Sequence, residues 1–148
     1  MPATTTRTRP PRRRAGQVTE VDIGGMDIHI TITELADGRP GEVFLRAGKQ
    51  GSTIAGLCEA LSLTTSLALQ HGTPVQDVVT RLQAMRYEPA GLTNDPDIPQ
   101  TCSISDYLAR RLHALYLTPE EPIVQALPTP QTRRLLTIAD DAQNPVFA

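Results

Sequence analysis

The segment Gly48-Lys49-Gln50-Gly51-Ser52-Thr53 carries residue types that bind anions. It joins a predicted strand to a predicted helix, where glycines, a lysine and free backbone N–H groups can hold a phosphate. The order differs from a P-loop, in which lysine follows the second glycine and precedes serine or threonine. The alternative is a plain turn in which Ser52 or Thr53 caps the helix. Lys49, Gly51, Ser52 and Thr53 are therefore candidate phosphate-binding residues with a structural alternative.

Arg86 is a second candidate for anion binding, because a guanidinium can contact a phosphate or a carboxylate through two hydrogen bonds. Its alternative role is an ion pair with Glu88, Asp95 or Asp97 that holds the surrounding loop together. Arg86 and Glu88 therefore enter the candidate site together, as residues that bind a nucleotide or a partner.

Asn94 and Asp106 complete the candidate nucleotide-binding or partner-binding site. Asn94 is typical of an Asx-type turn, in which its side chain bonds nearby backbone. Asp106 is more typical of a carboxylate in the first turn of a helix, where it suits the helix dipole, than of a general acid.

Metal and redox chemistry are not predicted. Cys58 and Cys102 are far apart, and neither has a cysteine or histidine at ligand spacing. The three histidines are equally scattered, and nothing pairs a nucleophile with a base. We expect no catalytic residue and no metal ligand, and the cysteine usage suits a cytosolic, reducing environment.

The charge is unevenly distributed along the 148 residues. Five of the 14 basic residues, all arginines from Arg7 to Arg14, lie before residue 15, which leaves nine basic against 16 acidic residues in the remainder. A basic arm on an acidic body can bind nucleic acid or an acidic partner. The alternative is a solvated, disordered leader over residues 1–17, which has little to bury and lacks the apolar core of a secretory signal.

Alternating apolar residues predict strands in the first half of the chain. Ile28, Ile30 and Ile32 alternate with polar residues, as in a half-buried strand. Shorter alternating runs lie on either side, separated from it by glycine-containing turns. Together the three runs predict an antiparallel meander.

The first predicted helix runs from about Thr53 to His71 and ends at Gly72, a favourable C-cap residue. It is apolar over most of its circumference, so we expect it to be the buried central helix of the core. Its polar interruptions make it too polar for a membrane span, and no membrane association is expected.

Two further helices are predicted. Thr73 as N-cap, Pro74 at the first position and Gln76 completing a capping box indicate the start of the second helix. Ser103 is expected to cap the third. Between them, residues 86–99 contain three prolines, which stiffen a connection long enough to suggest a function.

These segments predict an α+β domain over residues 18–117, a small three-stranded antiparallel sheet followed by three helices on one face. Disordered tails are expected on both sides, the basic arm at 1–17 and a Pro-rich, mostly disordered tail at 118–148. The sheet has exposed edges, which makes self-pairing possible, and the oligomeric state stays open.

The chain resembles the region near the C-terminus of vitamin B12-dependent (class II) ribonucleotide reductases, a module similar to the TSCPD domain that also occurs in small standalone proteins. Arg7–Pro11 resembles the lead-in to that region. The resemblance extends over most of residues 19–117 and is carried, in the same order, by these segments: 37–44, 48–57, 66–72, 86–91, 94–99, 103–104 and 106–107.

The motif that gives the TSCPD domain its name departs from the family pattern. Its Thr-Ser-Cys-Pro-Asp positions fall on residues 102–106, where only Ser103 and Asp106 agree. The family cysteine is Ile104 here, so a thiol role at that position is absent.

The resemblance implies a place in deoxyribonucleotide synthesis and, through it, in DNA replication. The parent enzymes reduce ribonucleotides by a radical mechanism with adenosylcobalamin, but their catalytic barrel and redox cysteines have no counterpart in this sequence. We therefore expect a member of the ribonucleoside-diphosphate reductase family that acts as an accessory or regulatory module and binds no cofactor by itself.

The first hypothesis is a cytoplasmic module that docks to a ribonucleotide reductase large subunit or binds a nucleotide, presenting residues 86–100 and 48–53. The second is a small nucleic-acid-binding protein whose Arg7–Arg14 arm contacts phosphates, with binding that falls steeply as salt rises. An enzyme in its own right ranks last, because no nucleophile–base pair or metal site is visible.

Overall fold

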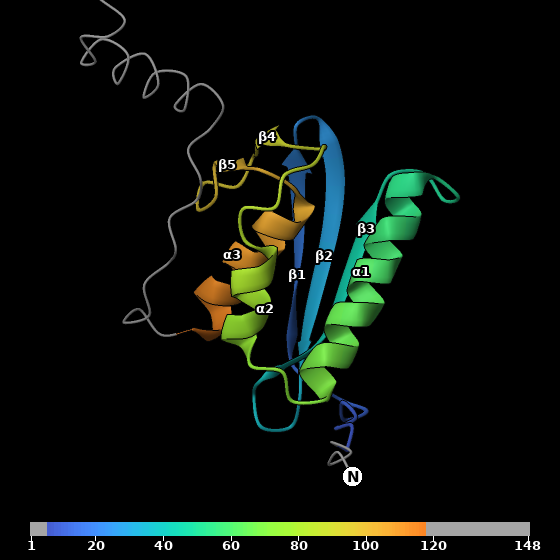
Figure 1. Ribbon diagram of the computed structural model, residues 1–148, viewed down its shortest axis with the longest axis vertical. Helices are drawn as coiled ribbons and strands as arrows, with labels where there is room; N and C mark the ends of the chain where they lie inside the picture. The colour runs from blue at the N-terminus through green and yellow to red at the C-terminus, as the bar shows by residue number, and fades with distance from the viewer. Residues whose placement is uncertain (1–5, 118–148) are drawn as a thin grey trace, which may run out of the picture.

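The computed structural model describes residues 6–117, which form a three-stranded antiparallel sheet, a small two-stranded ribbon and three helices (Figure 1). This confirms the predicted α+β class and the order of the main elements, whereas the ribbon of β4 and β5 was not predicted. The Pro-rich tail predicted at 118–148 lies outside the described residues. The elements are β1 (Gly16–Ile23), β2 (Met26–Glu34), β3 (Pro40–Ala47), α1 (Thr53–Gln70), α2 (Val75–Leu82), β4 (Gly91–Leu92), β5 (Gln100–Thr101) and α3 (Ile104–Tyr116).

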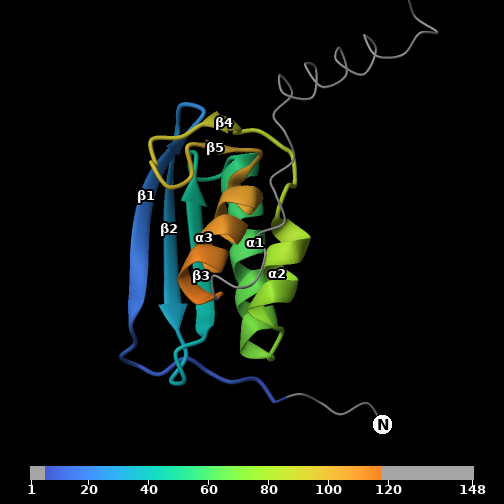
Figure 2. The same ribbon diagram turned by 90° about the vertical axis from the view of Figure 1, so that its left-hand side faces the viewer.

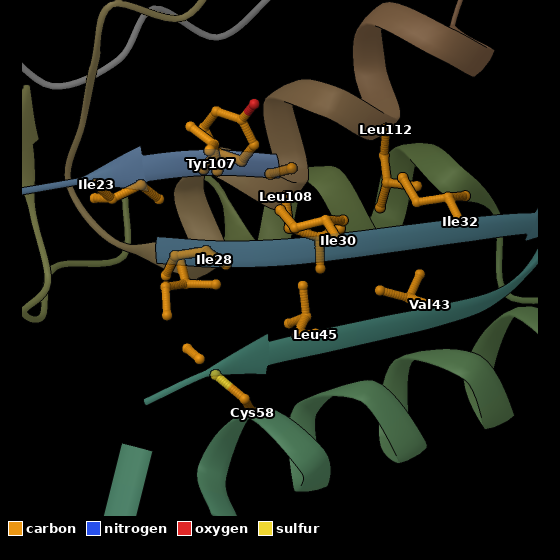
Figure 3. Packing of buried hydrophobic residues seen from close by; sticks show 14 of the residues in the cluster. Ile23, Ile28, Ile30, Ile32, Val43, Leu45, Cys58, Tyr107, Leu108 and Leu112 are labelled. Carbon is orange, nitrogen blue, oxygen red and sulfur yellow. The ribbon is translucent and has the colours of Figure 1, made fainter. Parts of the chain in front are cut away.

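The sheet is the predicted meander, with β2 between β1 and β3. Ile30 pairs with Leu45 and Ile32 pairs with Val43, so the apolar residues of neighbouring strands share one face. Because side chains alternate across a strand, the polar residues between them point to the opposite face. Figure 3 shows the apolar face packed against α3, with these labelled core residues: Ile23, Ile28, Ile30, Ile32, Val43, Leu45, Tyr107, Leu108 and Leu112.

Helix α1 lies along the outer edge of β3 (Figure 1). The Leu45 N–H donates to Ser62 Oγ at 2.8 Å, and the Val43 N–H donates to Ser66 Oγ at 2.9 Å. Gln70 Nε2 donates to the carbonyl of Gly41, near the start of β3, at 2.8 Å. The polar side chains of α1 thus satisfy backbone groups that an edge strand would otherwise leave unpaired.

The prediction that this first helix is the buried central helix was wrong. Leu57, Leu63 and Leu67 are 62%, 59% and 43% exposed. The face of α1 that is buried is mostly polar: Cys58, Ser62, Thr65, Leu69 and Gln70. This face is polar because α1 lies beside the edge of β3. A buried N–H of that edge left without an acceptor would cost about 1–3 kcal/mol, and Ser62 and Ser66 supply the acceptors.

The capping box predicted for the second helix was also wrong. Pro74 has an extended ψ of 141° and is itself the N-cap of α2, which begins at Val75, and among residues 6–117 no side chain caps this helix. Gln76 Nε2 instead donates to Thr80 Oγ1 within the helix. The predicted cap of the third helix is confirmed, since Ser103 Oγ accepts a hydrogen bond from the Asp106 N–H at 3.0 Å.

Part of the basic arm contacts the domain. β1 begins at Gly16, two residues before the predicted boundary. Arg7 Nε donates to Gln70 Oε1 at 2.6 Å, and the Arg14 guanidinium pairs with Glu42 at 2.6 Å. The described part of the arm therefore lies across the lower end of the sheet and α1 (Figure 2). The prediction of disorder remains a prediction for residues 1–5, which lie outside the described residues.

None of the helices within residues 6–117 combines the length and apolar character needed to cross a bilayer.

Candidate functional site

The connection between α2 and α3 is fixed at both ends by the buried carboxylate of Asp106. This carboxylate accepts hydrogen bonds from the Ala84 N–H at 2.8 Å, before the connection, and from the Cys102 N–H at 3.1 Å, after it. Thr101 Oγ1 donates to it at 2.9 Å, and Arg110 donates from one turn along α3 at 2.8 Å. Asp106 has no exposed surface, so it anchors the connection and cannot contact a ligand in solvent.

Ser103 adds a second link at the same place. Its hydroxyl caps α3 and also donates to the Met85 carbonyl at 2.6 Å. Nearby, Ser105 N–H donates to the Tyr87 hydroxyl at 2.9 Å. Together with the bond from the Ala84 N–H to Asp106, these contacts hold the first residues of the connection against the N-terminal turn of α3.

A second buried carboxylate, Asp95, orders the middle of the connection. Tyr107 Oη donates to Asp95 Oδ2 at 2.6 Å, and Arg111 pairs with the same oxygen at 3.0 Å. Arg111 also donates to Tyr107 Oη at 3.2 Å and lies over the tyrosine ring. The Asp97 N–H closes an Asx-type turn on Asp95 Oδ1 at 2.9 Å. An ion pair thus holds the connection, but its cation is Arg111 of α3, and the ion pair predicted for Arg86 remains a prediction.

The charges of this cluster shift its pKa values in opposite directions. Burial by itself raises the pKa of Asp95, but the Tyr107 hydroxyl, the Asp97 N–H and the Arg111 charge outweigh it and leave the pKa lowered. Burial, followed by the hydrogen bond to Asp95, raises the pKa of Tyr107 to about 12. At neutral pH the pair is therefore a carboxylate that accepts a hydrogen bond from a neutral phenol.

Asn94 attaches the connection to the outer edge of β1. The Asp22 N–H donates to Asn94 Oδ1 at 2.8 Å, and the Asn94 N–H donates back to the Asp22 carbonyl at 3.4 Å. One step further, the Gly24 N–H donates to the Leu92 carbonyl at 3.0 Å. Gly24 has a φ of +56°, and an added Cβ would lie 2.5 Å from the Ala90 carbonyl oxygen, so this contact requires glycine.

We call the exposed side chains of residues 86–92 the loop surface. Arg86 and Glu88 are exposed, Leu92 is 68% exposed and Tyr87 is 38% exposed. The backbone beneath them is held by the contacts of Asp106, Asp95 and Asn94 described above. The loop surface therefore presents an apolar side chain with flanking charges on a rigid support.

The 48–53 turn has the structure of a helix cap. Ser52 is the N-cap of α1, and its hydroxyl accepts a hydrogen bond from the Ala55 N–H at 3.3 Å. Gly48 and Gly51 have φ values of +69° and +85°, which glycine adopts without strain. Lys49, Gly51 and Thr53 are exposed. The structural alternative considered for Ser52 is confirmed, and phosphate binding at this turn remains a prediction.

The two candidate segments, the 48–53 turn and the loop surface, lie at the same end of the molecule, on either side of the turn between β1 and β2 (Figure 1).

Sequence reasoning missed two residues that hold this end, Arg110 and Arg111. The signal that could have found them is spacing, because Asp106 with Arg110 and Tyr107 with Arg111 are i, i+4 neighbours on a helix.

Both cysteines are free thiols. Cys58 is buried beside β3, and burial raises the pKa of its thiol, which disfavours the reactive thiolate. Within residues 6–117 no group of three or more His, Cys, Asp and Glu side chains is arranged to hold a metal ion.

Comparison with known proteins gives a consistent result. A family model described as the TSCPD domain matches residues 3–116. The chain is 45% identical over 106 residues to a vitamin B12-dependent ribonucleotide reductase of Streptantibioticus cattleyicolor, covering 72% of this chain and 18% of the relative. A vitamin B12-dependent ribonucleotide reductase of Rhodopirellula baltica is 34% identical over 112 residues, covering 76% of this chain and 11% of the relative. No solved structure matches.

The relatives are named as vitamin B12-dependent enzymes, and a B12 group would need a site that can enclose it. A groove of about 750 Å³ lies between α1 and α2 and is open to solvent. Leu61, Thr64 and Ala68 line one side, and Val78 and Arg81 line the other. A site that buries a large cofactor is normally an enclosed cleft with convergent polar groups. This open groove does not have that form and does not suit a B12 group, and the expectation that the chain binds no cofactor by itself remains a prediction.

Proposed function

The chain belongs to the TSCPD domain family, and from this premise we propose that it serves cytoplasmic deoxyribonucleotide synthesis by docking to a ribonucleotide reductase subunit. In this role it is an accessory or regulatory domain, and the reduction itself takes place on the partner. The chain spans between about a tenth and a fifth of the length of the relatives named above, so their activity, substrates and cofactor belong to this proposal only through the partner.

The observation that carries docking is the loop surface. An exposed leucine costs free energy in water and contributes most when a partner covers it. Leu92 is such a residue, and its backbone carbonyl is held by Gly24. Pre-ordering of this kind lowers the entropy lost on association, because the loop does not have to be fixed at that moment.

Nucleotide binding at the 48–53 turn is the weaker form of the proposal. Lys49 is exposed there, but the hydroxyl of Ser52 is already engaged with the Ala55 N–H. Nucleic-acid binding by the arm is weaker still, because Arg7 and Arg14 are engaged with Gln70 and Glu42. Neither has a second observation in its favour.

Affinity capture from a lysate of the source organism tests the proposal. The intact 148-residue chain serves as bait, and captured proteins are identified by mass spectrometry. We expect a ribonucleotide reductase large subunit in the eluate at physiological salt. A bait with Leu92→Glu should lose it, whereas Leu63→Glu, which charges an equally apolar and similarly exposed leucine on α1, should retain it.

Recovery of no reductase by the intact bait would contradict docking. Recovery of DNA or RNA instead, lost when salt is raised, would transfer support to the arm. The test uses single substitutions because residues 86–100 include the buried Asp95 and Ile98, whose loss would unfold the support of the loop surface.

A further inference from the structure

The groove between α1 and α2 has mostly apolar walls. It forms because α1 packs on β3 whereas α2 packs on α3, so the two helices do not close on each other. Methyl and methylene groups make up most of its lining: Leu61, Thr64, Ala68, Val78, Thr80 and Leu82. Apolar surface of this kind is stabilised when another apolar group covers it and removes it from water.

The walls of the groove have the spacing that receives a helix. Leu61, Thr64 and Ala68 follow one another at i, i+3 and i+7 and form a stripe along α1, while Val78 and Leu82 are i, i+4 neighbours on α2. The stripe on α1 is about 11 Å long at 1.5 Å per residue. A groove between two such stripes binds an amphipathic helix with apolar residues at i, i+3, i+4 and i+7.

A segment beyond α3 carries this pattern. Residues 133–142 read Arg-Arg-Leu-Leu-Thr-Ile-Ala-Asp-Asp-Ala. Apolar residues stand at i, i+3, i+4 and i+7 in it: Leu135, Ile138, Ala139 and Ala142. Thr132 before the segment suits a helix N-cap, and Pro145 after it suits a helix end. As a helix the segment would be about 15 Å long, which is enough to cover the stripe on α1.

The point at which α3 ends brings this segment within reach of the groove. Asp106 in the first turn of α3 accepts a hydrogen bond from the Ala84 N–H just after α2, so the two packed helices run antiparallel. The end of α3 therefore lies near the start of α2 (Figure 1). The 15 residues of 118–132 follow, and a proline-rich linker of this length can span up to about 47 Å. Helix α2 is about 12 Å long, so the whole groove is accessible to the segment.

The charges beside the groove complement those of the segment and give it a direction. Asp77 and Arg81, one turn apart on α2, border the groove and are exposed, and no ion pair within residues 6–117 engages either of them. The segment has arginines at 133–134 and aspartates at 140–141. When it enters at the start of α2 and runs toward its end, the arginines lie beside Asp77 and the aspartates beside Arg81. The reverse direction would place like charges together.

We propose that residues 133–142 bind the groove between α1 and α2 of their own chain as an amphipathic helix. The helix forms on docking, because ten residues with arginines at the start and aspartates at the end oppose the helix dipole and are marginal in isolation. A flexible linker gives an effective concentration of about 1 mM, so an intrinsic Kd of about 0.1 mM keeps about nine-tenths of the molecules docked. The TSCPD match ends at residue 116, so this contact is an addition to the family domain.

Amide hydrogen exchange and amide resonances of the full chain, both followed by NMR, test the proposal. We expect exchange across residues 135–142 to be about tenfold slower than in an unfolded peptide, at every protein concentration. Ile138→Glu should abolish this slowing and shift the amide resonances of Leu61, Ala68 and Val78. Thr137→Glu is the matched control, since it places the same charge on the opposite face of the helix, and it should do neither.

A charge reversal in the groove tests the direction of the segment. The double variant Asp77→Arg with Arg81→Asp should reduce the slowing at least about threefold, because both pairs then join like charges. Exchange at the rate of an unfolded peptide in the intact chain, or equal effects of Ile138→Glu and Thr137→Glu, would overturn the proposal. Slowing that increases with protein concentration would place the segment on a second copy and overturn docking within one chain. These measurements involve no reductase, so the result is independent of the proposed function.

Discussion

At the residue scale, two buried carboxylates organise the functional end of the molecule. Asp106 joins the residues on either side of the connection, and Asp95 holds its middle through Tyr107 and Arg111. A buried carboxylate is stable only when its oxygens have hydrogen-bonding partners. For both Asp95 and Asp106 these partners are backbone N–H groups, a hydroxyl and an arginine. These residues position the loop surface without belonging to it.

Replacing Asp106 with alanine should destabilise the protein by about 3 kcal/mol or more, because it leaves Arg110 and buried N–H groups without their acceptor. Asp77→Ala is the matched control, since Asp77 also lies in the first turn of a helix but is exposed, and it should cost less than about 1 kcal/mol. Urea unfolding followed by circular dichroism measures both. Equal losses would show that Asp106 acts only through the helix dipole.

The Asp95–Tyr107 pair should make stability depend on pH at both extremes. The lowered pKa of Asp95 contributes stability above its ordinary value near 4 that is lost as pH falls through the lower folded value. The raised pKa of Tyr107 contributes stability that is present below about pH 10 and lost as pH rises to about 12.

Urea midpoints between pH 2 and pH 12 measure this dependence. Tyr107→Phe should reduce the slope at both ends, because it removes the phenol and the hydrogen bond that lowers the pKa of Asp95. Tyr116→Phe should reduce only the alkaline slope, since burial and then the charge of Glu34 raise the pKa of Tyr116 to about 12. An unchanged slope in Tyr107→Phe would rule out the assigned role.

At the element scale, α1 replaces a fourth strand. Its serines bond the β3 edge as the backbone of another strand would, and this leaves its leucines facing solvent. The arrangement accounts for a helix whose buried face is polar. Within the three-stranded sheet, β1 is left as the edge without a helix beside it (Figure 2).

Ser62→Ala should destabilise the protein by about 1–3 kcal/mol, because it leaves the buried Leu45 N–H without an acceptor. Thr64→Ala is the matched control. The Thr64 hydroxyl is exposed and bonds only to carbonyls of its own helix, so its loss should change stability by less than about 0.5 kcal/mol. Chemical denaturation distinguishes the two, and equal effects would contradict edge covering by α1.

The strands and the cap of α3 could be predicted from sequence because they depend on local patterns. Alternation of Ile28, Ile30 and Ile32 determines a half-buried strand, and Ser103 three residues before Asp106 determines a cap. The orientation of α1 could not be predicted, since its leucines suggest burial and only the position of β3 reveals the need for hydroxyls. The pairing of Asp95 with Arg111 was missed because it joins a loop to a helix that follows it.

At the scale of the whole molecule, the loop surface and the basic arm lie apart. The loop surface lies at the end that carries β4 and β5, and the described part of the arm crosses the opposite end (Figure 2). A partner docked at the loop surface therefore leaves the contacts of Arg7 with Gln70 and of Arg14 with Glu42 undisturbed.

The affinity of the purified full chain for a purified ribonucleotide reductase large subunit from the same organism tests the central claim most directly. We predict a Kd of about 1 μM or tighter by biolayer interferometry. Leu92→Glu should weaken it at least tenfold, and Leu63→Glu should change it less than about twofold, because only Leu92 belongs to the loop surface. Absence of binding by the intact chain, or equal weakening by both variants, would contradict docking through the loop surface.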